Sequence, residues 1–342
     1  MAYQPGQVKK AVRLSLKAGH TPMLWGSPST AKTSVLREIA EELKLKVIYV
    51  DLMSIDLVDL NGVISKSADG KRGIYLPMQM FPLEGDPIPK GYRGFLLIFD
   101  ELTNCPPSYI QSILSVVYDK RLGGNKLHPR CFIAAAGNLI SDKCGTFAIP
   151  SSLKRRVVHF EVELSYKHWR DNWAIHNNID YRVMAFLEAF PDKFYTFNPE
   201  DKSNTYACGG SWEMLSDVLK HIKELDLTAL CLLQGYIPVG IARELIMYCS
   251  IYNDKGMPPF EEILKEPRTV HFDTAPSYQY ALQGLVAANS NKQNIEKIML
   301  FVNRLSIEFA VICVKQINAK TKGIGEMDCI EEFVENCAKE FS

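Results

Sequence analysis

The residues best placed to do chemistry lie in one short stretch, where Gly26 is followed by small residues and then by Lys32 and Thr33. A lysine can reach the β- and γ-phosphates of a nucleotide, and a threonine hydroxyl can ligate Mg²⁺. The start of a helix also favours an anion. The stretch therefore has the physical form of a phosphate-binding loop. Its candidate nucleotide-binding residues are Gly26, Ser27, Pro28, Ser29, Thr30, Ala31, Lys32, Thr33 and Ser34.

The loop departs from the usual motif at Ala31, because that motif has a second glycine directly before the lysine. Without this glycine, the remaining pattern occurs by chance roughly 0.1–0.2 times in a chain of this length. An alanine there costs little if its φ angle stays negative. The alternative is an ordinary helix start with a lysine in its first turn, so the rest of the chain must decide.

A pair of carboxylates, Asp100 and Glu101, follows the apolar run Phe95–Phe99. Such a run predicts a strand buried on both faces, as in the centre of a parallel sheet, and ligands of open α/β sheets bind where strands end. Asp100 is therefore a candidate Mg²⁺ ligand, and Glu101 is a candidate base that polarises an attacking water. The alternative is a strand ending in solvated acids, but the upstream loop favours the catalytic interpretation.

Three further polar residues border predicted strands. Asn138 follows the apolar strand 131–137, where it could orient water and contact a γ-phosphate or simply form a turn. Arg155 and Arg156 precede a strand over 157–160. Arginine is suited to stabilising charge on a transferring phosphoryl group, whereas the alternative is a pair of solvated surface charges.

The elements that must position these residues alternate between helix and strand up to about residue 165 and are helical afterwards. We expect a nucleotide-binding domain over 1–165 and a helical domain over 166–342. Residues 56–62 predict a capped surface turn, with a metal site as the alternative, and residues 65–94 a loop with a hairpin near 74–76. The expected strands are 22–25, 47–50, 95–99, 131–137 and 157–160, and the expected helices are 5–18, 32–43, 108–119, 150–156, 181–190, 213–223, 241–251, 293–319 (as one or two helices) and 328–341.

Composition excludes some classes of function. The 342 residues suffice for one large or two ordinary domains, and 39 basic against 39 acidic residues give no net charge to favour nucleic acid or an anionic membrane. The 9 cysteines form no C-x-x-C pair, and Cys131 and Cys231 stand in apolar contexts. We therefore expect buried, reduced thiols in a cytoplasmic protein. No signal segment and no membrane-length apolar run is present. Trp169, Trp173 and Trp212 are expected in the core, and His168 and His176 have too few neighbours for a metal site.

The ordered set of motifs resembles the AAA+ ATPases, and within them the MoxR-like group. The order is phosphate loop, Asp-Glu strand, strand ending in Asn, and Leu-x-x-Arg before the last strand. Residues 56–62, Arg121-Leu122-Gly123 and Ala135-Ala136-Gly137-Asn138 match the MoxR-like pattern more narrowly. The match covers residues 1–165 and continues loosely through segments such as Ser211-Trp212-Glu213.

The resemblance implies an α/β fold, with a three-layer αβα P-loop core around a parallel sheet and an all-α lid domain. It implies ATP and Mg²⁺ as cofactors. It also implies roles for single residues: Lys32 and Thr33 as the Walker A pair, Asp100 on Mg²⁺, Glu101 as base, Asn138 as sensor 1, and Arg156, or failing that Arg155, as the arginine finger on a neighbouring subunit's nucleotide.

The function implied is that of a ring ATPase, expected to be a homo-hexamer, that remodels or matures a protein partner carrying a von Willebrand A domain. One departure is Gly210, which stands where many MoxR-like proteins have the sensor 2 arginine. Slow hydrolysis or a different coupling to the lid would follow. A weakly hydrolysing nucleotide-dependent scaffold is therefore the alternative. A nucleic-acid motor is a third hypothesis, against which the neutral charge argues.

Overall fold

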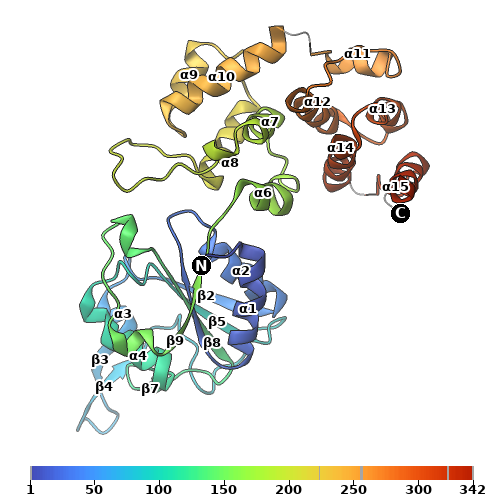
Figure 1. Ribbon diagram of the computed structural model, residues 1–342. Helices are drawn as coiled ribbons and strands as arrows, with labels where there is room; N and C mark the ends of the chain where they lie inside the picture. The colour runs from blue at the N-terminus through green and yellow to red at the C-terminus, as the bar shows by residue number, and fades with distance from the viewer. Residues whose placement is uncertain (1, 223, 255–256, 322, 341–342) are drawn as a thin grey trace. The chain divides into compact units, whose positions relative to one another are not determined.

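The computed structural model describes residues 2–222, 224–254, 257–321 and 323–340. The chain forms two compact units, and the colours of Figure 1 run through both from blue at the N-terminus to red at the C-terminus. The first unit comprises Met1–Leu164 with Asn198–Glu200, and the second comprises Ser165–Phe197 with Asp201–Ser342. The main division therefore falls after residue 164, next to the expected boundary at 165.

The first unit is built on a five-stranded parallel sheet with the strand order β2-β5-β8-β1-β9. Continuous apolar runs form its interior strands, and all seven residues of β5 are buried. The order places β8 between the strand that enters the phosphate loop and the strand that ends in the two carboxylates. The strands are β1 (Thr21–Trp25), β2 (Leu45–Asp51), β5 (Gly94–Asp100), β8 (Cys131–Gly137) and β9 (Val157–Glu161).

Helices cover both faces of this sheet, as Figure 1 shows. Because side chains alternate along a strand, Leu96 and Ile98 of β5 pack on one face with α1 (Pro5–Lys17) and α2 (Lys32–Glu42). Leu97 and Phe99 point to the other face, which α3 (Leu57–Asn61), α4 (Ile110–Asp119) and α5 (Ser151–Lys154) cover. The expected αβα core with a parallel sheet is therefore confirmed.

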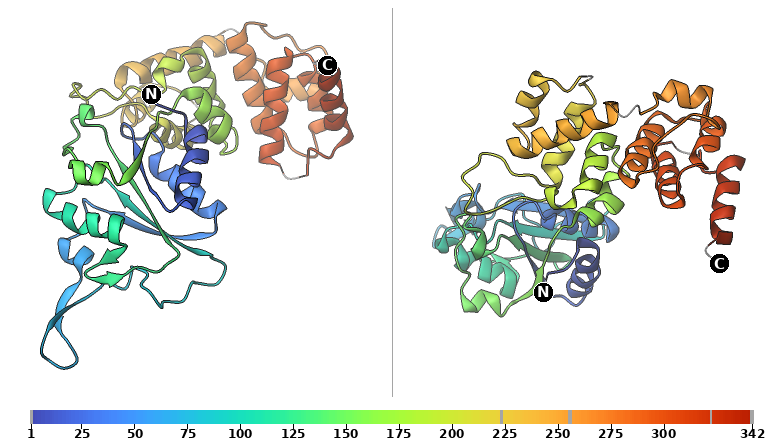
Figure 2. Two further views of the ribbon diagram at one scale, coloured as in Figure 1. Left: turned by 60° about the horizontal axis from the view of Figure 1, so that its bottom comes forward. Right: turned by 45° about the horizontal axis from the view of Figure 1, so that its top comes forward.

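Two small hairpins extend the core. The strands β3 (Val63–Lys66) and β4 (Gly73–Leu76) form the hairpin predicted near residue 75, and Figure 2 shows it projecting from the sheet. The Arg121-Leu122-Gly123 segment is part of a second hairpin, β6 (Arg121–Leu122) with β7 (Asn125–Lys126). Its Gly123 has φ +52°, and a Cβ there would lie 2.0 Å from the Asn61 carbonyl oxygen. Glycine is required at that approach.

Helices and no strands are found in the part of the second unit that the structure describes, as expected. The predicted helix 293–319 is two helices, and the predicted 213–223 begins earlier, at Gly209, where glycines hid the helix start. Phe341, the last residue of the predicted final helix, lies outside the described residues. The helices are α6 (Tyr166–Trp169), α7 (Tyr181–Ala189), α8 (Gly209–Leu219), α9 (Leu227–Leu233), α10 (Val239–Asp254), α11 (Phe260–Lys265), α12 (Pro276–Asn289), α13 (Ile295–Val302), α14 (Ile307–Lys320) and α15 (Asp328–Glu340).

Two core predictions were wrong. Trp169 and Trp212 are buried, but Trp173 is 42% exposed, because Arg170–Ala174 form a π-helical turn that shifts Trp173 out of register with Trp169. Cys131 is buried, whereas Cys231 is exposed on α9, a seven-residue helix whose apolar residues occupy both faces while only one face packs. No helix in the described ranges combines the length and apolarity needed to cross a bilayer.

Candidate functional site

The phosphate loop connects β1 to α2 through a strained backbone. A Cβ at Gly26 would lie 2.5 Å from the Val162 carbonyl oxygen and 2.7 Å from Thr30 Oγ1, so only glycine fits. Ser29 and Ala31 have φ angles of 62° and 66°. The negative φ angle under which alanine would cost little at position 31 is therefore not found. Left-handed residues within a turn aim successive N–H groups to one side and form an anion-binding concavity.

Lys32 is 8% exposed and is held inside the loop. Its Nζ donates to the carbonyl oxygens of Gly26 (2.8 Å) and Ser27 (2.9 Å) and to Asn138 Oδ1 (3.0 Å). Burial lowers the pKa of Lys32, and the charge of Glu101 opposes that shift. The lysine thus has three acceptors, and a phosphate oxygen is a stronger acceptor than a neutral carbonyl.

Thr33 and Asp100 place two oxygen ligands side by side. Thr33 Oγ1 donates to Asp100 Oδ2 at 2.6 Å, and the Tyr49 hydroxyl donates to the same oxygen at 3.0 Å. The backbone N–H of Glu101 donates to Asp100 Oδ1 at 3.0 Å. Burial, together with the Asp100 carboxylate, raises the pKa of Tyr49 to about 12. Hydroxyl and carboxylate oxygens are hard ligands of the kind Mg²⁺ prefers.

Glu101 and Asn138 are joined directly. Asn138 Nδ2 donates to Glu101 Oε2 at 2.9 Å, and the Asn138 backbone N–H donates to Thr103 Oγ1 at 2.9 Å. One amide therefore bridges Lys32 and Glu101. Glu101 has φ +54°, a strained conformation of the sort that clusters at functional sites. Burial, followed by the Asp100 charge, raises the pKa of Glu101.

Asp142 is a site residue that the sequence analysis missed. It is 7% exposed, accepts a hydrogen bond from Ser27 Oγ at 3.0 Å, and accepts another from the Leu139 N–H at 3.1 Å. It therefore ties the loop after β8 to the phosphate loop. Its only sequence signal is its position four residues after Asn138, which does not distinguish it from an ordinary turn residue.

The charges of the site fit a nucleotide bound with a divalent cation. Asp100, Glu101 and Asp142 all act electrostatically on Lys32, so carboxylates outnumber the lysine. Three negative charges against one would weaken the binding of a free polyphosphate, and a divalent cation entering with it would reduce that repulsion. Among the described residues, no cluster of His, Cys, Asp or Glu could hold a metal alone. Mg²⁺ is usually bound through one or two carboxylates together with substrate phosphates.

The arginine pair directly precedes β9, whose first residue pairs with Thr21 at the start of β1, whereas the phosphate loop follows the end of β1. Arg156 Nη1 donates to the Ser152 carbonyl oxygen at 3.0 Å, and its guanidinium carbon lies 4.2 Å from the centre of the Tyr118 ring. Tyr118 is 65% exposed, and Arg155 is exposed at the end of α5. Arg156 thus binds Ser152 and Tyr118 and makes neither of these contacts with Lys32 or Glu101.

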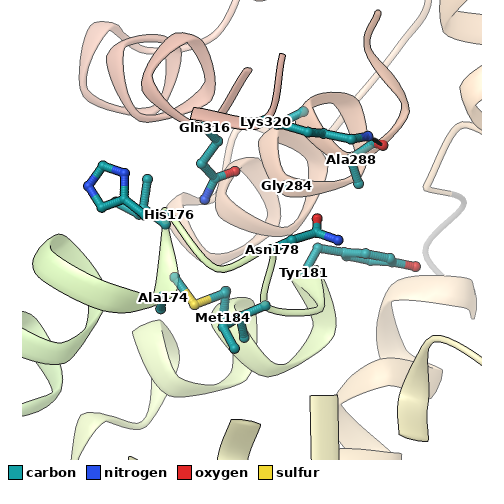
Figure 3. A pocket seen from close by; sticks show the side chains of 12 residues that line it. Ala174, His176, Asn178, Tyr181, Met184, Gly284, Ala288, Gln316 and Lys320 are labelled. Atoms are coloured by element: carbon teal, nitrogen blue, oxygen red, sulfur yellow. Dashed lines mark hydrogen bonds between the residues drawn. The ribbon is translucent and has the colours of Figure 1, made fainter. Parts of the chain in front are cut away.

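The second unit holds Gly210 and a small cleft. Gly210 is exposed in the first turn of α8, and nothing lies within 4 Å of where a Cβ would stand. The cleft, shown in Figure 3, lies between residues 174–184 and helices α12 and α14 and has a volume of about 50 Å³. His176, Asn178, Gln316 and Lys320 supply its polar lining. That volume suits a few water molecules rather than a nucleotide.

Comparisons with known proteins add little to this picture. No protein-family model matches the sequence, and no curated protein sequence matches it. One similar solved structure is a Cytophaga hutchinsonii protein described as a "putative ATPase". It shares 13% identity, over 93% of this chain and 82% of that one, with a TM-score of 0.37. At that TM-score the similarity supports no conclusion about this chain, whose fold follows from its own strand order and register.

Proposed function

We propose that this chain is a Mg²⁺-dependent ATPase of the MoxR-like AAA+ group. The observation that carries the proposal is the hydrogen-bonded chain Lys32–Asn138–Glu101, beside the Thr33–Asp100 pair. The residues come from the phosphate loop and from the carboxyl ends of two adjacent strands. Each has the chemistry that phosphoryl transfer to water requires.

Each side chain then has one task. The loop N–H groups and Lys32 bind phosphate oxygens, and Thr33 and Asp100 hold Mg²⁺, which neutralises charge on the phosphates when bound. Glu101 accepts a proton from the attacking water, a task that its raised pKa and half-buried position suit. Asn138 holds the Glu101 carboxylate and the Lys32 ammonium in a fixed relation.

We propose further that the protein acts as a ring, a hexamer by the MoxR-like resemblance. Arg156 would complete the site of the neighbouring copy, which agrees with its stacking on exposed Tyr118 instead of binding its own cluster. ATP turnover would serve to remodel a protein partner, and the resemblance supports one with a von Willebrand A domain. The zero net charge gives no support to a nucleic-acid substrate.

A second candidate is a nucleotide-dependent scaffold that hydrolyses slowly. Two observations favour it. Asn138 Nδ2 binds the Glu101 carboxylate that would otherwise face water, and Gly210 has no side chain for the place of the sensor 2 arginine. The scaffold would bind ATP tightly and assemble with it, with negligible turnover.

The test is ATP turnover by the wild type and by Glu101→Gln, measured across a protein concentration series while assembly is followed by light scattering. The ATPase proposal expects turnover per subunit to rise with assembly. It also expects Glu101→Gln to abolish turnover while ATP binding survives. Binding and assembly without turnover in either protein would instead support the scaffold. Turnover independent of assembly would contradict the shared site between subunits.

A further inference from the structure

Tyr49 lies in the site without belonging to any of the recognised motifs. It stands on β2, which pairs in parallel with β5 so that Asp51 is opposite Asp100. From there its hydroxyl donates to Asp100 Oδ2 at 3.0 Å. Tyr49 is 41% exposed, so burial of its ring contributes little to the core. Its hydroxyl bond to the carboxylate is the interaction that links this tyrosine to the site.

The tyrosine ring is itself held in place. The Arg37 guanidinium carbon lies 5.0 Å from the centre of the ring, within the range of a cation–π contact. Arg37 belongs to α2, the helix that starts at the phosphate loop, so the ring on β2 packs against a side chain of α2. A phenol held in this way has little freedom to turn its hydroxyl away from Asp100.

The Asp100 carboxylate is consequently held by donors from three elements. Thr33 of α2 and Tyr49 of β2 both donate to Oδ2, and the Glu101 N–H at the end of β5 donates to Oδ1. Removing one donor would let the carboxylate rotate about its Cβ–Cγ bond. A metal ligand that must be reoriented binds its metal less tightly, and loss of an outer-shell partner typically costs affinity for that reason.

We propose that Tyr49 is a positioning residue for the metal site, which orients the Asp100 carboxylate and so lowers the Mg²⁺ concentration needed for nucleotide binding. The inference rests on the proposed function. It assigns no contact between Tyr49 and the nucleotide, and it predicts that the hydroxyl, not the ring, carries the effect.

The experiment compares Tyr49→Phe with the wild type by titrating Mg²⁺ into protein mixed with a fluorescent ATP analogue. Tyr49→Phe keeps the ring beside Arg37 and removes only the hydroxyl. We expect the Mg²⁺ midpoint to rise roughly three- to tenfold, the equivalent of one lost hydrogen bond. Binding of the analogue in EDTA should stay unchanged. Tyr75→Phe, on an exposed tyrosine of the β3–β4 hairpin, is the matched control and should leave the midpoint unchanged.

The outcomes separate the two proposals. An unchanged Mg²⁺ midpoint in Tyr49→Phe, with thermal unfolding like the wild type, overturns the role of Tyr49 alone. Equal weakening of binding with and without Mg²⁺ also overturns it, because a general structural role would act in both conditions. Absence of Mg²⁺-dependent nucleotide binding in the wild type overturns the proposed function and this inference with it.

Discussion

Polar side chains in the first unit gather where strands end, whereas those of the second unit are enclosed between helices. In the first unit Lys32, Asp100 and Asn138 are each less than 9% exposed. Lys32 donates to Asn138, and Asp100 accepts from Thr33, the residue after Lys32, at the edge of the sheet where the strands end. In the second unit Arg182 pairs with Asp180 and donates to the carbonyl oxygens of Leu219, the last residue of α8, and of Ile222 just beyond it.

The difference between the two units indicates which hydrogen bonds a bound ligand can replace. The acceptors of Lys32 include two carbonyl oxygens of the phosphate loop. A phosphate oxygen can take their place as acceptor without leaving a buried polar group unsatisfied elsewhere in the protein. The Arg182 bonds hold the carbonyl oxygens of Leu219 and Ile222, at and just beyond the end of α8, where they stabilise the fold of the second unit. We therefore expect changes in the first unit to alter activity and changes in the second to alter mainly stability.

The largest expected effect is that of Arg156→Ala. Loss of an arginine finger costs on the order of 10³–10⁵ in turnover, so ATPase activity should nearly vanish while ATP binding and assembly persist. Arg155→Ala is the matched control, an exposed neighbour that should change turnover little. Mixing Arg156→Ala with Glu101→Gln subunits should restore some activity, because a working arginine and a working glutamate can then meet at one interface.

If Arg155→Ala gave the large loss instead, the finger would be reassigned to Arg155. If neither variant lost activity in the assembled state, the two arginines would be the solvated surface pair that the sequence also allows, and the active site would be complete within one chain.

Gly210→Arg is the variant most able to break the comparison, since it would give the second unit a positive charge where many MoxR-like proteins have the sensor 2 arginine. Nothing lies within 4 Å of the new Cβ, so the fold should accept the arginine. If Gly210 does occupy the sensor 2 place, a charged hydrogen bond to phosphate should tighten ATP binding roughly tenfold or more. Gly240→Arg is the control, because Gly240 is equally exposed and unobstructed in the first turn of α10.

Binding should be measured by titration with a fluorescent ATP analogue at several salt concentrations. An equal gain in both arginine variants would be a nonspecific charge effect. No gain in affinity at Gly210 would mean that the resemblance does not extend to this position. The expectation that the first unit determines activity and the second mainly stability would then stand.

Two glutamines of α12 sharpen the comparison within the second unit. Gln279 is 3% exposed and bonds to the Thr274 carbonyl, to Ser306 Oγ and to the Ser306 N–H. Gln283 is fully buried, and its amide has no hydrogen-bond partner among the described residues. Gln279→Leu should therefore lower the free energy of unfolding by about 1–3 kcal/mol, and Gln283→Leu should raise it by about 1 kcal/mol.

Urea unfolding measures both effects, and each variant serves as the other's control because the residues lie one helical turn apart. Neither should change the Mg²⁺ midpoint of nucleotide binding. A loss of stability in Gln283→Leu would show that the buried amide has a partner, such as an internal water, and would place a structural polar site at the centre of the bundle.

The sequence predicted those site residues that directly follow a recognisable local pattern, such as an apolar strand. The apolar run before Asp100 and the strand before Asn138 each ended as expected, and parallel pairing then brought both ends together. Periodicity predicted that the second unit is helical, but it missed α6, α9, α11 and α12. At α12, Gly284 weakens the helical pattern, and its lack of a side chain leaves room for Tyr181, whose Cβ lies 2.7 Å from where a Cβ on Gly284 would stand.

The remaining site residues depended on which strands are neighbours. Tyr49 reaches Asp100 only because β2 pairs with β5, and Asp142 reaches Ser27 only because β8 lies beside β1. No local pattern encodes either pairing. The positive φ angle at Ala31 could not be predicted for a related reason. The left-handed turn is imposed by the loop as a whole and not by the alanine itself.

Ala31→Gly tests that last point and has the smallest expected effect. A non-glycine residue at φ 66° is strained by roughly 1–2 kcal/mol, but glycine adds about 0.5–1 kcal/mol of backbone entropy to the unfolded chain. The free energy of unfolding should therefore rise by about 1 kcal/mol or less. Ala11→Gly, within α1 and half-buried, has no strain to relieve and should lose about 1 kcal/mol. If Ala31→Gly also destabilised the protein, the loop would favour alanine for its rigidity, and the departure from the usual motif would be an adaptation that preorganises the phosphate site.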